Sequence, residues 1–167
     1  MLDYRNFADE GRVDLSGKIP AGTSFLSHEG KNYRLPSLRS QSGILRYGFL
    51  KEAEEGIDFN LNGQLEEEFL IVAADTEKAG VYDTLVMQTS SSLDLNKEPK
   101  VKAFKEEGGF ISFKGPYENE FNLAVSHFDE GGEAVWLAYD VLGHGTQVAG
   151  VIGANGQIQG VAPDSQL

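Results

Sequence analysis

The chain of 167 residues carries 26 acidic and 14 basic side chains, which gives a formal net charge of −12. A chain this acidic repels phosphate backbones and anionic lipid, so its composition argues against a nucleic-acid partner and against polybasic membrane binding. Cysteine is absent, which excludes disulfides, thiol catalysis and thiolate metal sites. No apolar run approaches the roughly 20 residues of a membrane-spanning helix, so we expect no membrane segment in this chain.

Short apolar stretches separated by turn residues predict β-strands along most of the chain. The stretches TSFLS and NYRLP flank residues 28–31 and predict a hairpin. Residues 43–50 predict a strand, and the continuous apolar run 68–75 predicts a buried one. Further candidate strands are 82–89, 100–104, 109–114, 121–128 and 133–140. Strands at this spacing are typical of an antiparallel β domain.

Two loops resemble calcium-binding patterns. Residues 58–63 read D-F-N-L-N-G, which matches the start of an EF-hand loop with oxygen ligands from Asp58, Asn60 and Asn62. The twelfth position of that loop holds Phe69 in place of the bidentate glutamate. A second run of alternating oxygens comprises Asp94, Asn96 and Glu98. Turn formation by these side chains is the default interpretation, and a calcium site in either loop is the alternative.

The composition changes after Asp140, and residues 143–167 carry a single charged side chain, Asp164. On propensity alone the run 143–153 is a poor helix, because each interior glycine costs about 1 kcal/mol relative to alanine. Such a helix is stable where its small residues pack closely against other backbone. His144 would then lie at the helix N-terminus, where the macrodipole favours a neutral imidazole that can accept a proton.

The segment HGTQVAGVIGANGQIQGVAPDSQL (144–167) resembles the histidine motif of the subtilisin-like serine peptidases, the subtilases. That motif reads H-G-T-x-V-A-G, followed by a short loop and G-V-A-P. The resemblance implies a serine-type endopeptidase that hydrolyses protein or peptide substrates, with His144 as the general base of an Asp–His–Ser triad. A triad of this kind requires no cofactor. Because the family's serine follows the histidine at a distance, we expect the nucleophile beyond Leu167 and this chain alone to be inactive.

The resemblance leaves two positions for the catalytic aspartate. Residues 2–7 resemble the segment that follows the aspartate motif in subtilases with a long insertion between the Asp and His segments, which places the aspartate upstream of Met1. The alternative is Asp75, which ends the apolar run 71–74, although Glu77 stands where the family has glycine.

On the first of these readings, residues 1–10 are a partial subtilase segment, 11–135 a β-rich insertion domain and 136–167 the truncated histidine-motif segment. The fold class that follows is α+β: a mainly antiparallel β insertion domain, then a partial subtilase-like α/β segment with one short helix.

A competing hypothesis makes the β domain a binding or oligomerisation module attached to a peptidase, and such a module could form a homo-oligomer. The resemblance favours an extracellular location, in the manner of secreted bacterial enzymes. His28 and His127 belong to no motif, and we expect both to be structural.

Overall fold

The computed structural model describes residues 11–117, 119–139, 144–154 and 159–162. The strands are β1 (Arg12–Asp14), β2 (Gly17–Pro20), β3 (Phe25–His28), β4 (Lys31–Arg34), β5 (Ile44–Lys51), β6 (Glu68–Ala74), β7 (Thr84–Met87), β8 (Lys100–Lys102), β9 (Phe110–Lys114), β10 (Glu120–Phe128) and β11 (Ala134–Ala138). The helices are α1 (Glu52–Glu55), α2 (Phe104–Glu107) and α3 (His144–Gly153), with a 3₁₀ turn η1 at Leu95–Lys97.

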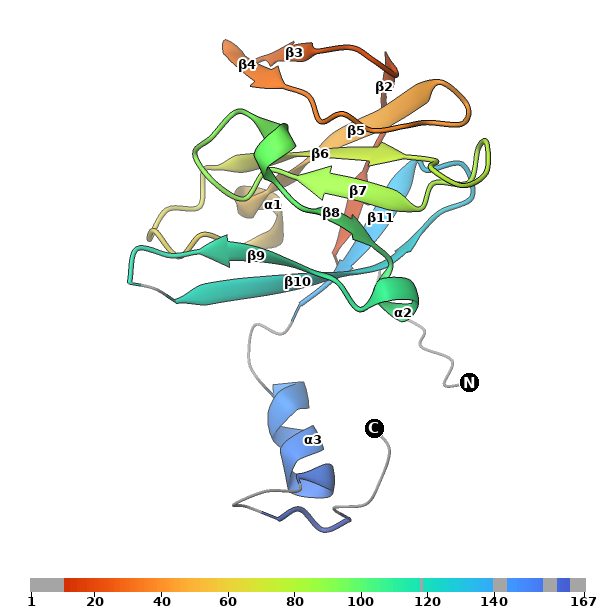
Figure 1. Cartoon of the computed structure of the whole chain (residues 1–167). Coiled ribbons are helices and arrows are strands. Elements are labelled where there is room, and N and C mark those ends of the chain that lie inside the picture. Colours follow the sequence, from red (N-terminus) through yellow and green to blue (C-terminus); the bar gives the residue numbers. More distant parts are fainter. Residues whose placement is uncertain (1–10, 118, 140–143, 155–158, 163–167) are drawn as a thin grey trace.

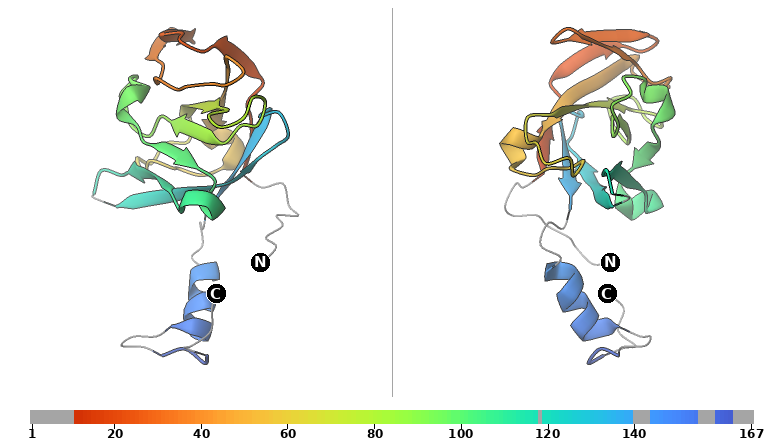
Figure 2. Two further views of the ribbon diagram at one scale, coloured as in Figure 1. Left: turned by 45° about the vertical axis from the view of Figure 1, so that its right-hand side comes forward. Right: turned by 90° about the vertical axis from the view of Figure 1, so that its left-hand side faces the viewer.

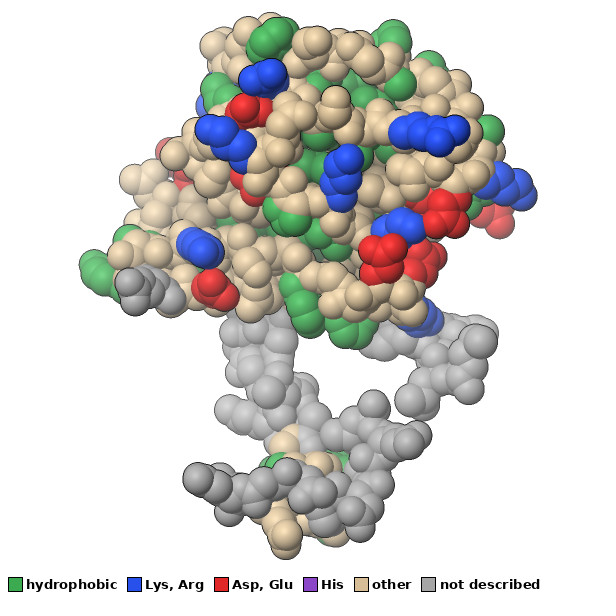
Figure 3. All heavy atoms as spheres, in the orientation of Figure 1, with side chains coloured by type: hydrophobic (Ala, Val, Ile, Leu, Met, Phe, Trp, Pro, Cys, Tyr) green, Lys and Arg blue, Asp and Glu red, His purple; other side chains and the backbone are tan. Residues whose placement is uncertain are grey.

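Two antiparallel sheets and a hairpin form what we call the β unit, residues 11–139 (Figure 1). One sheet has the strand order β1-β11-β10-β9, and the other has the order β2-β5-β6-β7-β8. The hairpin β3-β4 lies above the five-stranded sheet in Figure 1. The exposed aromatic pair Phe104 and Phe110 belongs to α2 and β9, and apolar side chains show in that part of the surface in Figure 3.

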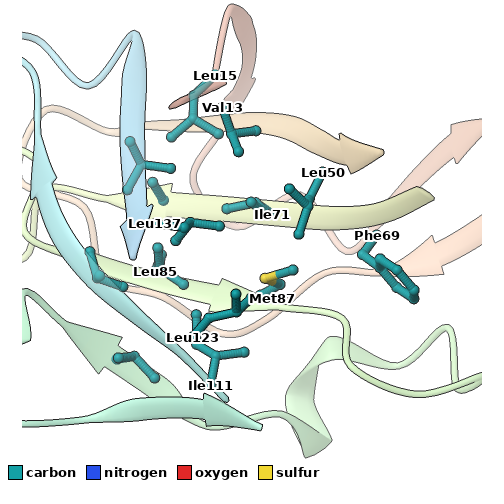
Figure 4. Packing of buried hydrophobic residues seen from close by; sticks show 14 of the residues in the cluster. Val13, Leu15, Leu50, Phe69, Ile71, Leu85, Met87, Ile111, Leu123 and Leu137 are labelled. Carbon is teal, nitrogen blue, oxygen red and sulfur yellow. The ribbon is translucent and has the colours of Figure 1, made fainter. Parts of the chain in front are cut away.

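The strand β6 contributes to two hydrophobic cores because its side chains alternate between the faces of the sheet. Phe69, Ile71 and Ala73 belong to the core between the two sheets, part of which Figure 4 shows. Leu70, Val72 and Ala74 belong to the core that also holds hairpin and loop residues such as Tyr33 and Leu95. The continuous apolar run of this strand is therefore explained by burial on both faces.

The first and last strands of the β unit are neighbours. β1 pairs antiparallel with β11, with Val13 opposite Val135. The amide of Leu137 donates a hydrogen bond of 2.8 Å to the carbonyl of Gly11. Gly11 has φ +70°, and a Cβ there would overlap the Leu137 carbonyl oxygen, so this close approach requires glycine. The chain therefore enters and leaves the β unit side by side.

The predicted fold class was wrong. The chain is β-rich with short helices, and its described part contains no subtilase-like α/β segment. An α/β layer needs parallel strands beside its helix, whereas every strand pair in the described sheets is antiparallel. One short helix was predicted, whereas the described residues contain three, α1, α2 and α3. α1 and α2 are single turns that end at Gly56 and Gly108, both at φ +68°.

Candidate active site

The helix α3 carries the proposed catalytic histidine at its first position. Its ten residues, HGTQVAGVIG, run from His144 to Gly153, and Figures 1 and 2 show it outside the β unit. The side chain of His144 lies outside the described part, so the structure places only the backbone of this residue. That position at a helix N-terminus is where the macrodipole disfavours a charged imidazolium.

The described surface of α3 is apolar and exposed. Val148, Val151 and Ile152 are 44%, 65% and 41% exposed. A methyl group at Gly150 would have no neighbouring atom within 4 Å. Among the described residues, nothing covers this surface, although small and apolar helix residues are typical of close packing against other elements.

The chain returns onto the end of α3 through residues 160–162. The amides of Gly160, Val161 and Ala162 donate hydrogen bonds of 2.7, 2.8 and 2.7 Å to the carbonyls of residues 154, 151 and 152, respectively. These bonds satisfy carbonyls that a helix C-terminus leaves free. A Cβ at residue 160 would lie 2.6 Å from the Ile152 carbonyl oxygen, so the glycine of the G-V-A-P sequence permits this contact.

Asp75, the alternative catalytic aspartate, joins the loop before β5 to the loop after β6. Its carboxylate is fully buried at the end of β6 and accepts hydrogen bonds from Ser40 Oγ (2.5 Å), the Ser42 amide (3.0 Å) and the Gly80 amide (2.7 Å). Burial alone raises the pKa of Asp75, but these hydrogen bonds outweigh it and lower the pKa from its ordinary value. The described contacts of this carboxylate are thus those of a structural anchor, and its catalytic role stays a prediction.

The first calcium candidate forms a loop closed by its own polar side chains. Asp58 accepts hydrogen bonds from the amides of Asn62 (3.1 Å) and Gly63 (2.7 Å). Asn60 Oδ1 accepts from the Asn62 amide at 3.2 Å, and both asparagine Nδ2 groups donate to Glu67. The carboxylate that would have to bind an ion therefore serves as a turn acceptor. Calcium binding here stays a prediction.

The second calcium candidate also uses its polar side chains for hydrogen bonds within the protein. Asp94 accepts a hydrogen bond of 3.1 Å from the Asn96 amide and so caps η1. Asn96 Nδ2 donates to the carbonyl of Leu35 at 3.0 Å, and Glu98 accepts from Thr89 Oγ1 at 2.7 Å. The Asn96 side chain also donates to Asp94 at 3.0 Å, and this hydrogen bond is the largest cause that lowers the pKa of Asp94; the Asn96 amide and the charge of Arg34 lower it further.

The sequence analysis missed one cluster of ligand-type side chains. The carboxylates of Glu29 and Glu68 and the imidazole of His28 place their ligand atoms within 4.8 Å of one another, the one such group in the part of the chain that the structure describes. Tyr33 is fully buried nearby. Burial raises the pKa of its hydroxyl, and the charges of Glu68 and Glu29 raise it further. The Tyr33 ring packs edge-on against Phe49, on which the His28 ring also stacks. A histidine beside a turn glutamate was the only local signal.

The third histidine, His127, lies on β10 and stacks on Trp136, with ring centroids 4.4 Å apart and an interplanar angle of 8°. Its Nδ1 lies 3.1 Å from Ser126 Oγ. These two residues are consecutive on a strand and His127 is exposed, so their contact does not resemble a buried nucleophile–base pair.

Comparison with known proteins gives a distant similarity to a peptidase. The chain is 24% identical over 182 aligned positions to pyrolysin of Pyrococcus furiosus, a subtilisin-like protease. The alignment covers 91% of this chain but 12% of pyrolysin, so the chain spans about an eighth of the length of that relative. No family model and no solved structure matches. The similarity suggests a relation to the subtilases and links the chain to peptidases.

In the described part of the chain, no helix combines the length and the apolar character needed to span a bilayer.

Proposed function

We propose that this chain is part of a subtilisin-like serine peptidase, in which the β unit is an insertion between the aspartate and histidine segments and His144 is the general base. In the proposed reaction, His144 takes the proton from the serine hydroxyl as it attacks the peptide carbonyl, and then donates a proton to the leaving amine. The serine and the aspartate belong to the longer protein. Similarity to a protease of this class also favours a secreted enzyme.

The observation that carries the insertion proposal is the pairing of β1 with β11. A domain inserted into a surface loop must return the chain to the point where it left. Paired antiparallel strands keep their Cα atoms about 4.5–5.5 Å apart, so the two connections of the β unit fit one loop of a host domain. Since β11 continues to Ala138, we place the end of the insertion after that strand rather than at residue 135.

The surface of α3 supports the second part of the proposal. Exposing Val148, Val151 and Ile152 to water is unfavourable, and burying the 41–65% of each that is exposed would contribute about 0.6–2 kcal/mol. A host catalytic domain would cover them, and the glycines of α3 would allow its backbone to approach closely. His144 would then be held at the helix N-terminus in a rigid environment, as a general base requires.

For the aspartate, the proposal favours a position upstream of Met1. Asp75 lies within the β unit and already accepts hydrogen bonds from three loop groups. A catalytic aspartate must instead accept a hydrogen bond from the general-base imidazole.

The test is to replace residues 11–139 with a short glycine–serine linker in the longer peptidase. We expect the shortened enzyme to keep its hydrolysis of a small peptide substrate and its reaction with a serine-directed phosphonate. If the triad used Asp75, the deletion would abolish both. Asp75→Asn in the intact enzyme is the companion variant, because it separates loss of the aspartate from failure of the shortened protein to fold.

A further inference from the structure

The cluster at the hairpin turn brings together residues from two separate elements. His28 ends β3 and Glu29 follows it in the turn, while Glu68 begins β6 of the five-stranded sheet. His28 Nε2 lies 3.1 Å from Glu68 Oε1. At this point the hairpin contacts the sheet through side chains rather than through backbone pairing.

Two oxygen atoms where the hairpin meets the sheet are buried and lack hydrogen-bond partners among the described residues. They are Glu68 Oε1 and the hydroxyl of Tyr33, whose whole side chain is 0% exposed. An unpartnered buried polar atom costs about 1–3 kcal/mol, so such atoms call for an explanation. His28 Nε2 lies within ion-pair distance of Glu68 Oε1, but the two atoms do not form an aligned hydrogen bond.

A shared metal ion would account for this arrangement. In a tetrahedral site with metal–ligand distances of about 2.0–2.1 Å, neighbouring ligand atoms lie about 3.3 Å apart, close to the observed separation of the His28 and Glu68 atoms. The imidazole is also held in place, because its ring stacks on Phe49 of β5 with centroids 4.1 Å apart. A ligand whose ring orientation is already fixed loses little conformational freedom on binding.

We propose that His28, Glu29 and Glu68 bind a divalent transition-metal ion of the zinc type. One imidazole and two carboxylates match the ligands that zinc accepts, and two negative charges balance a divalent cation. Calcium fits less well, because it takes oxygen ligands and more of them. The ion would join the β3-β4 hairpin to the start of β6 and stabilise the β unit, whatever the function of α3.

The test is calorimetric titration of the 167-residue chain with zinc chloride, together with thermal unfolding with and without zinc. We expect one zinc ion per chain, not displaced by excess calcium, and a higher Tm in its presence. His28→Gln and Glu68→Gln keep the side-chain size and should each weaken binding at least about 10-fold. His127→Gln is the matched control and should bind zinc as the unchanged chain does.

The proposal is overturned if zinc does not bind saturably, or if His28→Gln and Glu68→Gln bind it as tightly as the unchanged chain. Loss of zinc binding in His127→Gln, or in a His144→Gln variant, would place the ion elsewhere and also overturn it. Should His28→Gln fail to fold, Glu68→Gln decides the outcome alone, with circular dichroism as the check on its fold.

Discussion

The substitution Asp75→Asn separates a structural from a catalytic role for this carboxylate. Asparagine has the same shape, and its remaining oxygen can still accept from Ser40 Oγ. Its amide group, however, faces the Ser42 and Gly80 amides, which both donate to the present Oδ2. The variant therefore loses two hydrogen bonds to a charged acceptor, each of which contributes about 1–2 kcal/mol. We expect the free energy of unfolding to fall by about 2–4 kcal/mol at pH 7.

The effect also has a defined dependence on pH. The folded state lowers the pKa of Asp75 below its unfolded value of about 3.9, so the ionised carboxylate contributes stability above that pH. This contribution is lost as the pH falls through the folded-state pKa. The difference between Asp75→Asn and the unchanged chain should therefore be largest near neutral pH and shrink in acid.

The assay is urea unfolding of the 167-residue chain at several pH values, followed by the fluorescence of its single tryptophan, Trp136. Asp14→Asn is the control, because the Asp14 side chain is 68% exposed and its ion pair with Arg12 should contribute less than about 1 kcal/mol. A change below about 0.5 kcal/mol for Asp75→Asn at pH 7 would refute the structural role. It would also return Asp75 to consideration as a triad member.

Two further substitutions test the packing and the helix. Gly48→Ala should lower the free energy of unfolding of the β unit by about 1–3 kcal/mol, because a Cβ there overlaps the carbonyl oxygen of Asp14. Gly150 has open space around it, so Gly150→Ala should instead raise the helix content measured by circular dichroism, consistent with a gain of about 1 kcal/mol in helix propensity. Phe59→Ala should cost about 3–5 kcal/mol in urea unfolding because the ring is fully buried, whereas Phe25→Ala at 55% exposure should change stability by less than about 0.5 kcal/mol. Equal effects within either pair would contradict the packing described above.

Local patterns predicted several elements of the β unit. The hairpin around residues 28–31 is confirmed as β3-β4, and the strands predicted at 43–50 and 68–75 are confirmed as β5 and β6. The strand predicted at 100–104 is shorter, because the backbone turns at Ala103 and α2 begins at Phe104. A single helical turn that ends at a glycine leaves too little periodicity to be recognised from sequence.

The features that the sequence did not predict depend on contacts between distant segments. The His28–Glu29–Glu68 cluster arises only when the hairpin folds onto β6, and no local pattern joins those residues. The loops of Asp58 and Asp94 illustrate a different ambiguity, since alternating oxygens serve turn amides and metal ions equally well. The α/β expectation came from the family resemblance, because the histidine motif of that family belongs to an α/β catalytic domain. The described residues do not contain the strands of such a domain.

The central claim is that His144 is the general base of a serine peptidase, and the most direct measurement is peptide hydrolysis by the longer enzyme carrying His144→Ala. With His127→Ala as the control, we predict that kcat falls at least about 100-fold for the first variant and stays unchanged for the second. Both variants should keep the circular dichroism spectrum of the unchanged enzyme. Retention of more than about a hundredth of the original kcat by a folded His144→Ala enzyme would contradict the claim.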